Sequence, residues 1–197
     1  MSLMQLCWDL IWSPRSKGIP YVVENGTFNQ GLKLMLSLFG IMLGISFVEN
    51  IAVFLLTPVS LAYVFGVLFG YILMWAFFKG FWLVLAYLYV KNVSNRELTF
   101  KQTFTAVSYA MAFDFPLAIL GLVNSLLIIA LNLMHFGYVA YLLEYFIGIA
   151  LLVIALYYIL CSLGLYRKML GTSSAHIIFI GIVYIAILLV TAIALRA

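Results

Sequence analysis

The feature that most constrains this chain is a series of long apolar runs that fill most of its 197 residues. A helix needs roughly twenty consecutive apolar residues to cross the hydrocarbon core of a bilayer. Strands of a membrane β-barrel would instead alternate apolar and polar residues, and these runs do not. The expected fold class is therefore an all-α polytopic membrane helix bundle with five transmembrane helices, at about 34–56, 60–90, 103–131, 138–165 and 173–195.

Little polar sequence remains for a soluble domain, because 67% of the residues are hydrophobic and 8% are charged. We expect a cytoplasmic N-terminal interfacial segment over residues 1–31 and a transmembrane domain over residues 32–197. Within the first segment, helical spacing places apolar residues on one face, with Gln5 and Asp9 opposite. Trp8 and Trp12 are typical anchors of a helix that lies in the membrane interface. The apolar face of this short helix consists of Leu3, Leu6, Cys7, Leu10 and Ile11.

The basic residues predict the orientation of the spans. Arg196 lies beyond the last span and Lys79 lies within the second one, whereas the other eight fall on a single side. Because cytoplasmic loops carry an excess of lysine and arginine, the N-terminus is expected in the cytoplasm and the C-terminus outside. The net charge of +4 indicates the anionic lipid of the inner leaflet as a partner, not nucleic acid. The eight residues are Arg15, Lys17, Lys33, Lys91, Arg96, Lys101, Arg167 and Lys168.

Five polar residues stand out inside the predicted spans. An ionisable group at membrane depth is costly, so each should face protein or water and have a partner. Lys79 and Asp114 lie at similar distances from the loop near residue 96, on antiparallel helices, which predicts an ion pair. Glu49, Asn124 and Glu144 lie toward the outer ends of their helices. They would form either a proton or cation path or a set of structural hydrogen bonds, and Glu144 could instead reach outward to the interface.

Small residues and one proline predict how the helices pack. Gly40 and Gly44 in the first span, and Gly66 and Gly70 in the second, have the spacing that lets membrane helices approach closely. This spacing favours packing within the first helical hairpin, with a homodimer face as the alternative. Pro116 lies well inside the third span, where it is expected to kink the helix.

No pattern in the chain predicts catalysis or a metal site. The zinc-protease motif His-Glu-x-x-His does not occur, and the only two aspartates, Asp9 and Asp114, are far apart. Cys7 and Cys161 both fall near the inner face, where a disulfide is not expected. His135 and His176 fall at opposite membrane faces. We therefore expect no catalytic residue, no cofactor and no metal ligand.

The order of these elements resembles the Yip1 domain family of five-helix membrane proteins. The resemblance rests on Ile11-Trp12-Ser13-Pro14 before the first span, Thr99-Phe100-Lys101-Gln102 entering the third, Ser108-Tyr109-Ala110 followed by Pro116, and Leu165-Tyr166-Arg167-Lys168 before the last. Thr99 and Gln102 also fit a helix capping box, as do Ser94 and Glu97.

The resemblance implies a noncatalytic integral membrane protein, of prokaryotic type because the N-terminal segment is short. Such a protein would organise membrane or partner proteins, with a membrane-protein partner or a second copy of itself. The alternative is a small transporter or channel component that uses Glu49, Lys79, Asp114 and Glu144.

Overall fold

The computed structural model describes residues 1–56, 60–93, 98–134 and 136–194. The capping box expected at Ser94 and Glu97, the basic residues Arg96 and Arg196, and His135 lie outside the described residues. The described helices are α1 (Leu3–Trp12), η1 (Pro14–Gly18), α2 (Ile19–Asn25), α3 (Phe28–Leu56), α4 (Leu61–Val93), α5 (Phe100–Ala110), η2 (Met111–Phe113), α6 (Phe115–Leu133), α7 (Gly137–Leu170) and α8 (Ser174–Ala194).

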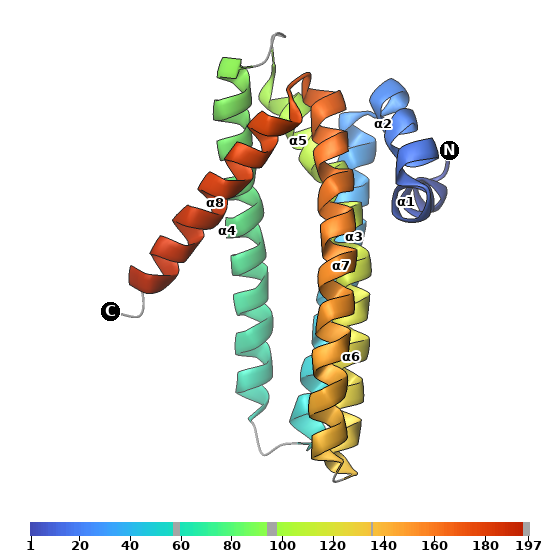
Figure 1. Cartoon of the computed structure of the whole chain (residues 1–197), viewed down its shortest axis with the longest axis vertical. Helices are drawn as coiled ribbons and strands as arrows, with labels where there is room; N and C mark the ends of the chain where they lie inside the picture. Colours follow the sequence, from blue (N-terminus) through green and yellow to red (C-terminus); the bar gives the residue numbers. More distant parts are fainter. Residues whose placement is uncertain (57–59, 94–97, 135, 195–197) are drawn as a thin grey trace.

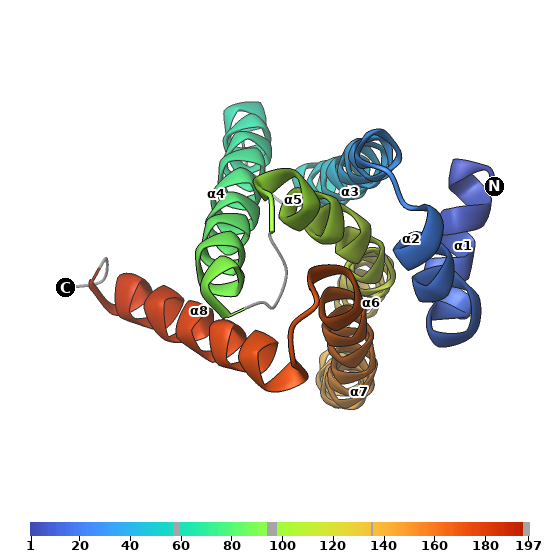
Figure 2. The same ribbon diagram turned by 90° about the horizontal axis from the view of Figure 1, so that it is seen from above.

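The long helices run side by side and α8 leans away from them (Figure 1). α6 packs against α7 and α3, while α4 packs against α3 and α8. Seen from above, α1 and α2 lie on the opposite side of the bundle from α4 and α8 (Figure 2). The N-terminal segment therefore covers only one flank of the bundle.

Four described helical segments are long and apolar enough to cross a membrane. Helix α8 contributes a shorter apolar stretch, Ser174–Ile187, within the part whose side chains the structure describes. The regular structure of the described residues is thus all helical, and the length and composition of four segments suit a membrane, while a fifth span stays a prediction. The four segments are Phe28–Ala52, Leu61–Asn92, Phe100–Leu131 and Leu142–Leu170.

Helix α1 begins at a serine cap, because the Ser2 hydroxyl accepts a hydrogen bond from the Gln5 amide at 3.1 Å. Its apolar face is buried in the bundle. The expectation that Asp9 lies on an exposed polar face is wrong, since Asp9 is buried and accepts a hydrogen bond from the side chain of Gln5. The reason is the turn η1, which folds back so that Gly18 lies against the backbone of Asp9 and Leu10.

Helix α5 begins at the expected capping box. The Thr99 amide donates to Gln102 Oε1 at 2.8 Å, and the Gln102 amide donates to Thr99 Oγ1 at 3.3 Å. The third predicted span is then interrupted by the 3₁₀ turn η2. Pro116 is the second residue of α6, where its missing amide removes no helical hydrogen bond. The expected kink in a continuous helix is therefore a break that ends just before the proline.

The buried core gathers at one end of the bundle, which we name the basic end. Here α3 and α5 begin and α4 and α7 end, so that Lys33, Lys91, Lys101, Arg167 and Lys168 lie around it with exposed side chains. Helix α5 fills this end between the long helices, and α1 and α2 cover one flank of it (Figure 2). Its most deeply buried large side chains include Leu6, Leu10, Leu34, Val90, Tyr109, Phe113, Leu165 and Leu170, each no more than 1% exposed.

Candidate functional site

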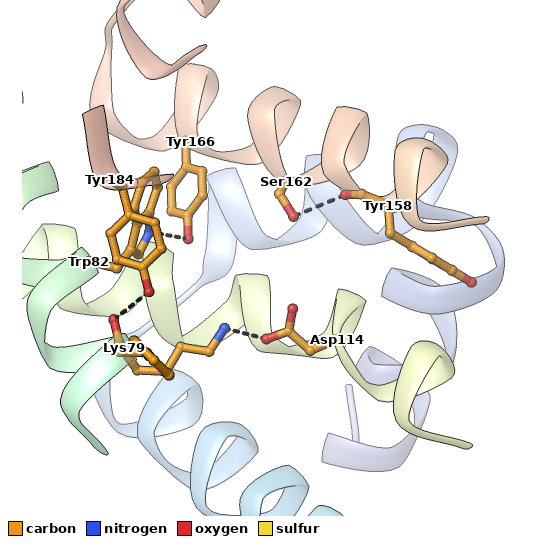
Figure 3. Close-up of polar contacts among 8 residues, drawn as sticks. Lys79, Trp82, Asp114, Tyr158, Ser162, Tyr166 and Tyr184 are labelled. Carbon is orange, nitrogen blue, oxygen red and sulfur yellow. Dashed lines mark hydrogen bonds and ion pairs between the residues drawn. The ribbon is translucent and has the colours of Figure 1, made fainter. Parts of the chain in front are cut away.

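The charged centre of the bundle is an ion pair between two elements that are distant in sequence. The Lys79 ammonium on α4 donates to the Asp114 carboxylate, which lies at the junction of η2 and α6 (Figure 3). The pair expected from the sequence is therefore present. Both side chains are partly exposed, 33% for Lys79 and 42% for Asp114.

Two further hydrogen bonds beside this pair also bind α4 to its neighbours (Figure 3). The Trp82 indole donates to the Tyr166 hydroxyl on α7 at 3.1 Å. The Tyr184 hydroxyl on α8 donates to the Phe78 carbonyl at 3.2 Å. The rings of Trp82 and Tyr184 lie edge to face, with centroids 5.3 Å apart. Polar contacts thus join α4 to α6, α7 and α8 at the level of the ion pair.

A cavity of about 300 Å³ adjoins the lysine of the pair. Its lining comes entirely from α4 and consists of Tyr71, Met74, Trp75, Phe78 and Lys79. The lysine alone among these residues carries a charge. Open space therefore reaches one member of the pair, and a transport role would require such access.

The remaining polar residues predicted for the outer leaflet are not joined to each other in the part of the chain that the structure describes. Glu144 on α7 is exposed and Glu49 on α3 is half-buried. The side-chain oxygen of Asn124 on α6 is buried without a hydrogen-bond partner in that part of the chain. Asn50 donates to the Ser46 carbonyl of its own helix at 2.7 Å. The contacts described here do not form the layer of outer polar residues expected from the sequence.

The glycines predicted to pack within the first hairpin do not do so. A methyl group placed on Gly40, Gly44, Gly66 or Gly70 would meet no atom within 4 Å. The interpretation of close packing between α3 and α4 through these positions is therefore wrong. Helices approach closely elsewhere, at Gly31, where a methyl group would lie 3.3 Å from the ring of Tyr109. The homodimer alternative stays a prediction.

A much larger apolar groove of about 1210 Å³ lies between α1 and the flank of the bundle. Its few polar side-chain groups are the Ser37 hydroxyl, the Cys7 thiol, the indole N–H groups of Trp8 and Trp12 and the hydroxyls of Tyr157 and Tyr158. Burial raises the pKa of the Cys7 thiol above its usual value, so this group is neutral at neutral pH. The groove is lined by Leu3, Met4, Cys7, Trp8, Ile11, Trp12, Leu34, Ser37, Leu38, Ile41, Phe115, Pro116, Ile119, Leu120, Val153, Ile154, Tyr157 and Tyr158.

Two tyrosines to which the sequence reasoning assigned no contact hold the N-terminal segment in place. The Tyr109 hydroxyl donates to the Thr27 carbonyl and lies 3.1 Å from the Gln30 side chain, and it accepts from the Thr27 amide at 3.1 Å. The Tyr158 hydroxyl donates to the Ile11 carbonyl at the end of α1, at 3.3 Å. A tyrosine in an apolar helix signals such a role, because its buried hydroxyl needs a partner.

Within the described residues, no three or more His, Cys, Asp or Glu side chains gather closely enough to hold a metal ion. Comparison with known proteins adds no assignment, since no family model, no curated protein and no solved structure matches this chain. The likeness to the Yip1 family therefore rests on the sequence features named above. Function has to be inferred from the ion pair, the groove and the surfaces of the bundle.

Proposed function

We propose that this chain is a noncatalytic integral membrane protein of the Yip1 kind that organises membrane or partner proteins in a prokaryotic cell membrane. The observation that carries the proposal is the pairing of Lys79 with Asp114. Because the two intramembrane charges neutralise each other between helices, they serve to position α4 within the bundle. A scaffold requires such internal contacts and needs no continuous path for an ion.

The surface of α1 supports the same proposal. One face of this helix is fixed in the bundle, whereas Met4, Trp8 and Trp12 remain 84%, 58% and 65% exposed. The rings of Trp8 and Trp12 lie together, with centroids 5.5 Å apart. A rigidly held aromatic patch at the basic end suits contact with the membrane interface or with another protein. We assign the residues 91–102 between α4 and α5 as the second contact region.

Copurification in mild detergent tests the scaffold proposal. The variant Trp8→Ala/Trp12→Ala removes the aromatic patch of α1. The matched control, Tyr145→Ala/Phe146→Ala, removes an adjacent pair on α7 that is equally exposed, at 63% and 66%. Quantitative mass spectrometry of proteins retained by a tagged chain should find a defined set with wild type and control, reduced in the α1 variant. Recovery of no enriched protein, or of an unchanged set with the α1 variant, would reject the proposal.

We further propose that α8 is a fifth span, which places the N-terminus in the cytoplasm and the C-terminus outside. The exposed basic residues at a single end of the bundle support this orientation. Single cysteines at Lys17, Phe136 and Ala197, in a background without Cys7 and Cys161, would report it. An impermeant maleimide should label positions 136 and 197 in intact cells and position 17 only after permeabilisation. Protection of position 197 would show that α8 does not cross the membrane.

A second candidate function is a small transporter or channel component that uses Glu49, Lys79, Asp114 and Glu144. The cavity beside Lys79 favours it, because open space reaches the ammonium of the pair and both paired side chains are partly exposed. Proteoliposomes that contain a pH-sensitive dye and carry an imposed potential would test it. Flux should exceed that of empty liposomes and fall in Asp114→Asn, and it should persist in Glu24→Gln, a carboxylate outside the spans. Flux equal to empty liposomes would exclude transport of protons.

A further inference from the structure

The groove under α1 has the size and lining of a site for a large apolar ligand. Its volume of about 1210 Å³ exceeds the roughly 300–1,000 Å³ of most small-molecule pockets. The walls come from α1, α3, α6 and α7, and nearly every lining side chain is apolar. A peptide segment would bring backbone amides and carbonyls that such walls leave without hydrogen bonds. A hydrocarbon chain brings none.

The groove extends from the basic end into the depth of the spans. Along α3 its lining runs from Leu34 to Ile41, and along α7 from Tyr158 back to Val153. Seven residues of α3 correspond to about 10 Å of helix rise. The groove is therefore flanked by membrane helices on one side and covered by the interfacial helix α1 on the other. Acyl chains of the adjoining leaflet have direct access to it.

A basic residue lies near the α7 wall of the groove. Arg15 lies in the turn that follows α1, close enough for its charge to act on Tyr157, which lines the groove, and on Cys161 one turn further along α7. Its side chain is exposed, and in the described residues no carboxylate is paired with it. A guanidinium binds phosphate through paired hydrogen bonds. The apolar space thus adjoins a group suited to an anionic lipid headgroup.

We propose that this groove binds an anionic glycerophospholipid of the cytoplasmic leaflet, with its acyl chains between α1 and the helices α3, α6 and α7, and its phosphate at Arg15. The bound lipid completes the packing between the N-terminal segment and the bundle. Helix α1 thereby acts as one wall of a lipid site, and Met4, Trp8 and Trp12 belong both to that wall and to the exposed aromatic face.

Native mass spectrometry from vesicles tests the headgroup contact. Equal amounts of phosphatidylglycerol and phosphatidylcholine with identical acyl chains are supplied to the full-length chain, and the bound lipids are counted. Wild type should retain phosphatidylglycerol preferentially. Arg15→Gln should lower that preference about fivefold, whereas Lys17→Gln, which removes a basic side chain from the same turn, should leave most of it. An unchanged preference in Arg15→Gln would overturn the headgroup assignment.

A second pair of variants tests the groove itself. Ile41→Trp fills the groove from α3, while Leu36→Trp places the same bulk on α3 outside the lining, at a side chain of similar exposure. We expect Ile41→Trp to lose bound phosphatidylglycerol and phosphatidylcholine, and Leu36→Trp to retain both. Equal retention in the two variants, or absence of bound lipid from wild type, would overturn the proposal. A wild-type dimer that Ile41→Trp dissociates would place a second copy in the groove and would also overturn it.

Discussion

The two halves of the bundle are built differently. At the basic end, α3 buries Leu34, Leu38 and Met42, and α7 buries a series of side chains from Tyr158 to Leu170. In the half farther from the basic end, which we name the outer half, the described side chains are exposed or half-buried. Val64 on α4 is the buried exception. The long helices that run through both halves are apolar in sequence. The difference in burial comes from α5, which lies between the long helices at the basic end only, and from α1 and α2, which cover one flank there.

This difference separates packing within the protein from contact with lipid. In a bilayer, the exposed apolar side chains of the outer half would contact lipid acyl chains. No hydrophobic effect drives these side chains together there. In the basic half, buried tyrosine hydroxyls and the ion pair add directional contacts to close packing. Substitutions in the basic half should therefore change stability, and similar substitutions in the outer half should not.

The largest effect is expected at Tyr109, the most completely buried aromatic residue of the basic half. Tyr109→Ala removes a side chain that is 0% exposed. It leaves the Thr27 amide without its partner and the Thr27 carbonyl with the Gly31 amide as its remaining donor. Truncation of a buried aromatic side chain costs about 3–5 kcal/mol. We expect a loss of this size in the free energy of unfolding, measured in detergent. Tyr145→Ala in the outer half should change it by less than about 0.5 kcal/mol.

The second comparison concerns two glycines in different surroundings. In Gly18→Ala the new methyl group would lie 2.7 Å from Leu10 Cα and 2.8 Å from the Asp9 carbonyl oxygen, so backbone must move. Such overpacking typically costs about 1–3 kcal/mol. Gly40→Ala meets no atom within 4 Å and should leave the monomer as stable as wild type. Comparable losses in both variants would contradict the distinction between a close-packed glycine and one with open space around it.

The ion pair tests whether polar contacts hold α4 to the rest of the bundle. Lys79→Met and Asp114→Asn should each lower the free energy of unfolding by about 1–2 kcal/mol, the range of polar contacts between membrane helices. The double variant should recover much of that loss, because no unpaired charge remains. Thermal unfolding of wild type, the two single variants and the double variant in detergent provides a double-mutant cycle. Strictly additive losses would show that the two side chains do not stabilise each other.

The smallest expected effect is on the reactivity of Cys7 in α1. Its raised pKa reduces the fraction of thiolate, so alkylation near pH 7.5 should be slow and should accelerate as the pH rises toward that pKa. Gly18→Ala should increase the rate at a given pH by loosening α1 from the bundle. Mass spectrometry after timed exposure to a maleimide measures both rates. A rate in wild type equal to that of an unfolded peptide would indicate that α1 does not dock.

Prediction from sequence succeeded where local chemistry decides the outcome. Apolar runs longer than a bilayer is thick predict long helices whatever their neighbours are, and four of them are described. The capping box at Thr99 is formed by residues three positions apart, so it does not depend on the fold. The Lys79 and Asp114 pair was predictable because a charge at membrane depth needs a partner, and few partners exist in this chain.

The tertiary structure decided every feature that depends on which apolar helix faces pack against each other. A membrane helix is apolar on all sides, so its sequence does not show that Gly31 packs closely while Gly40 and Gly44 do not. The burial of Asp9 depends on the turn that returns over α1, and the groove depends on how far α1 stands from α3 and α7. Hydropathy alone does not determine which apolar helix faces become neighbours, in lipid or in a protein core. Packing geometry and directional hydrogen bonds determine it.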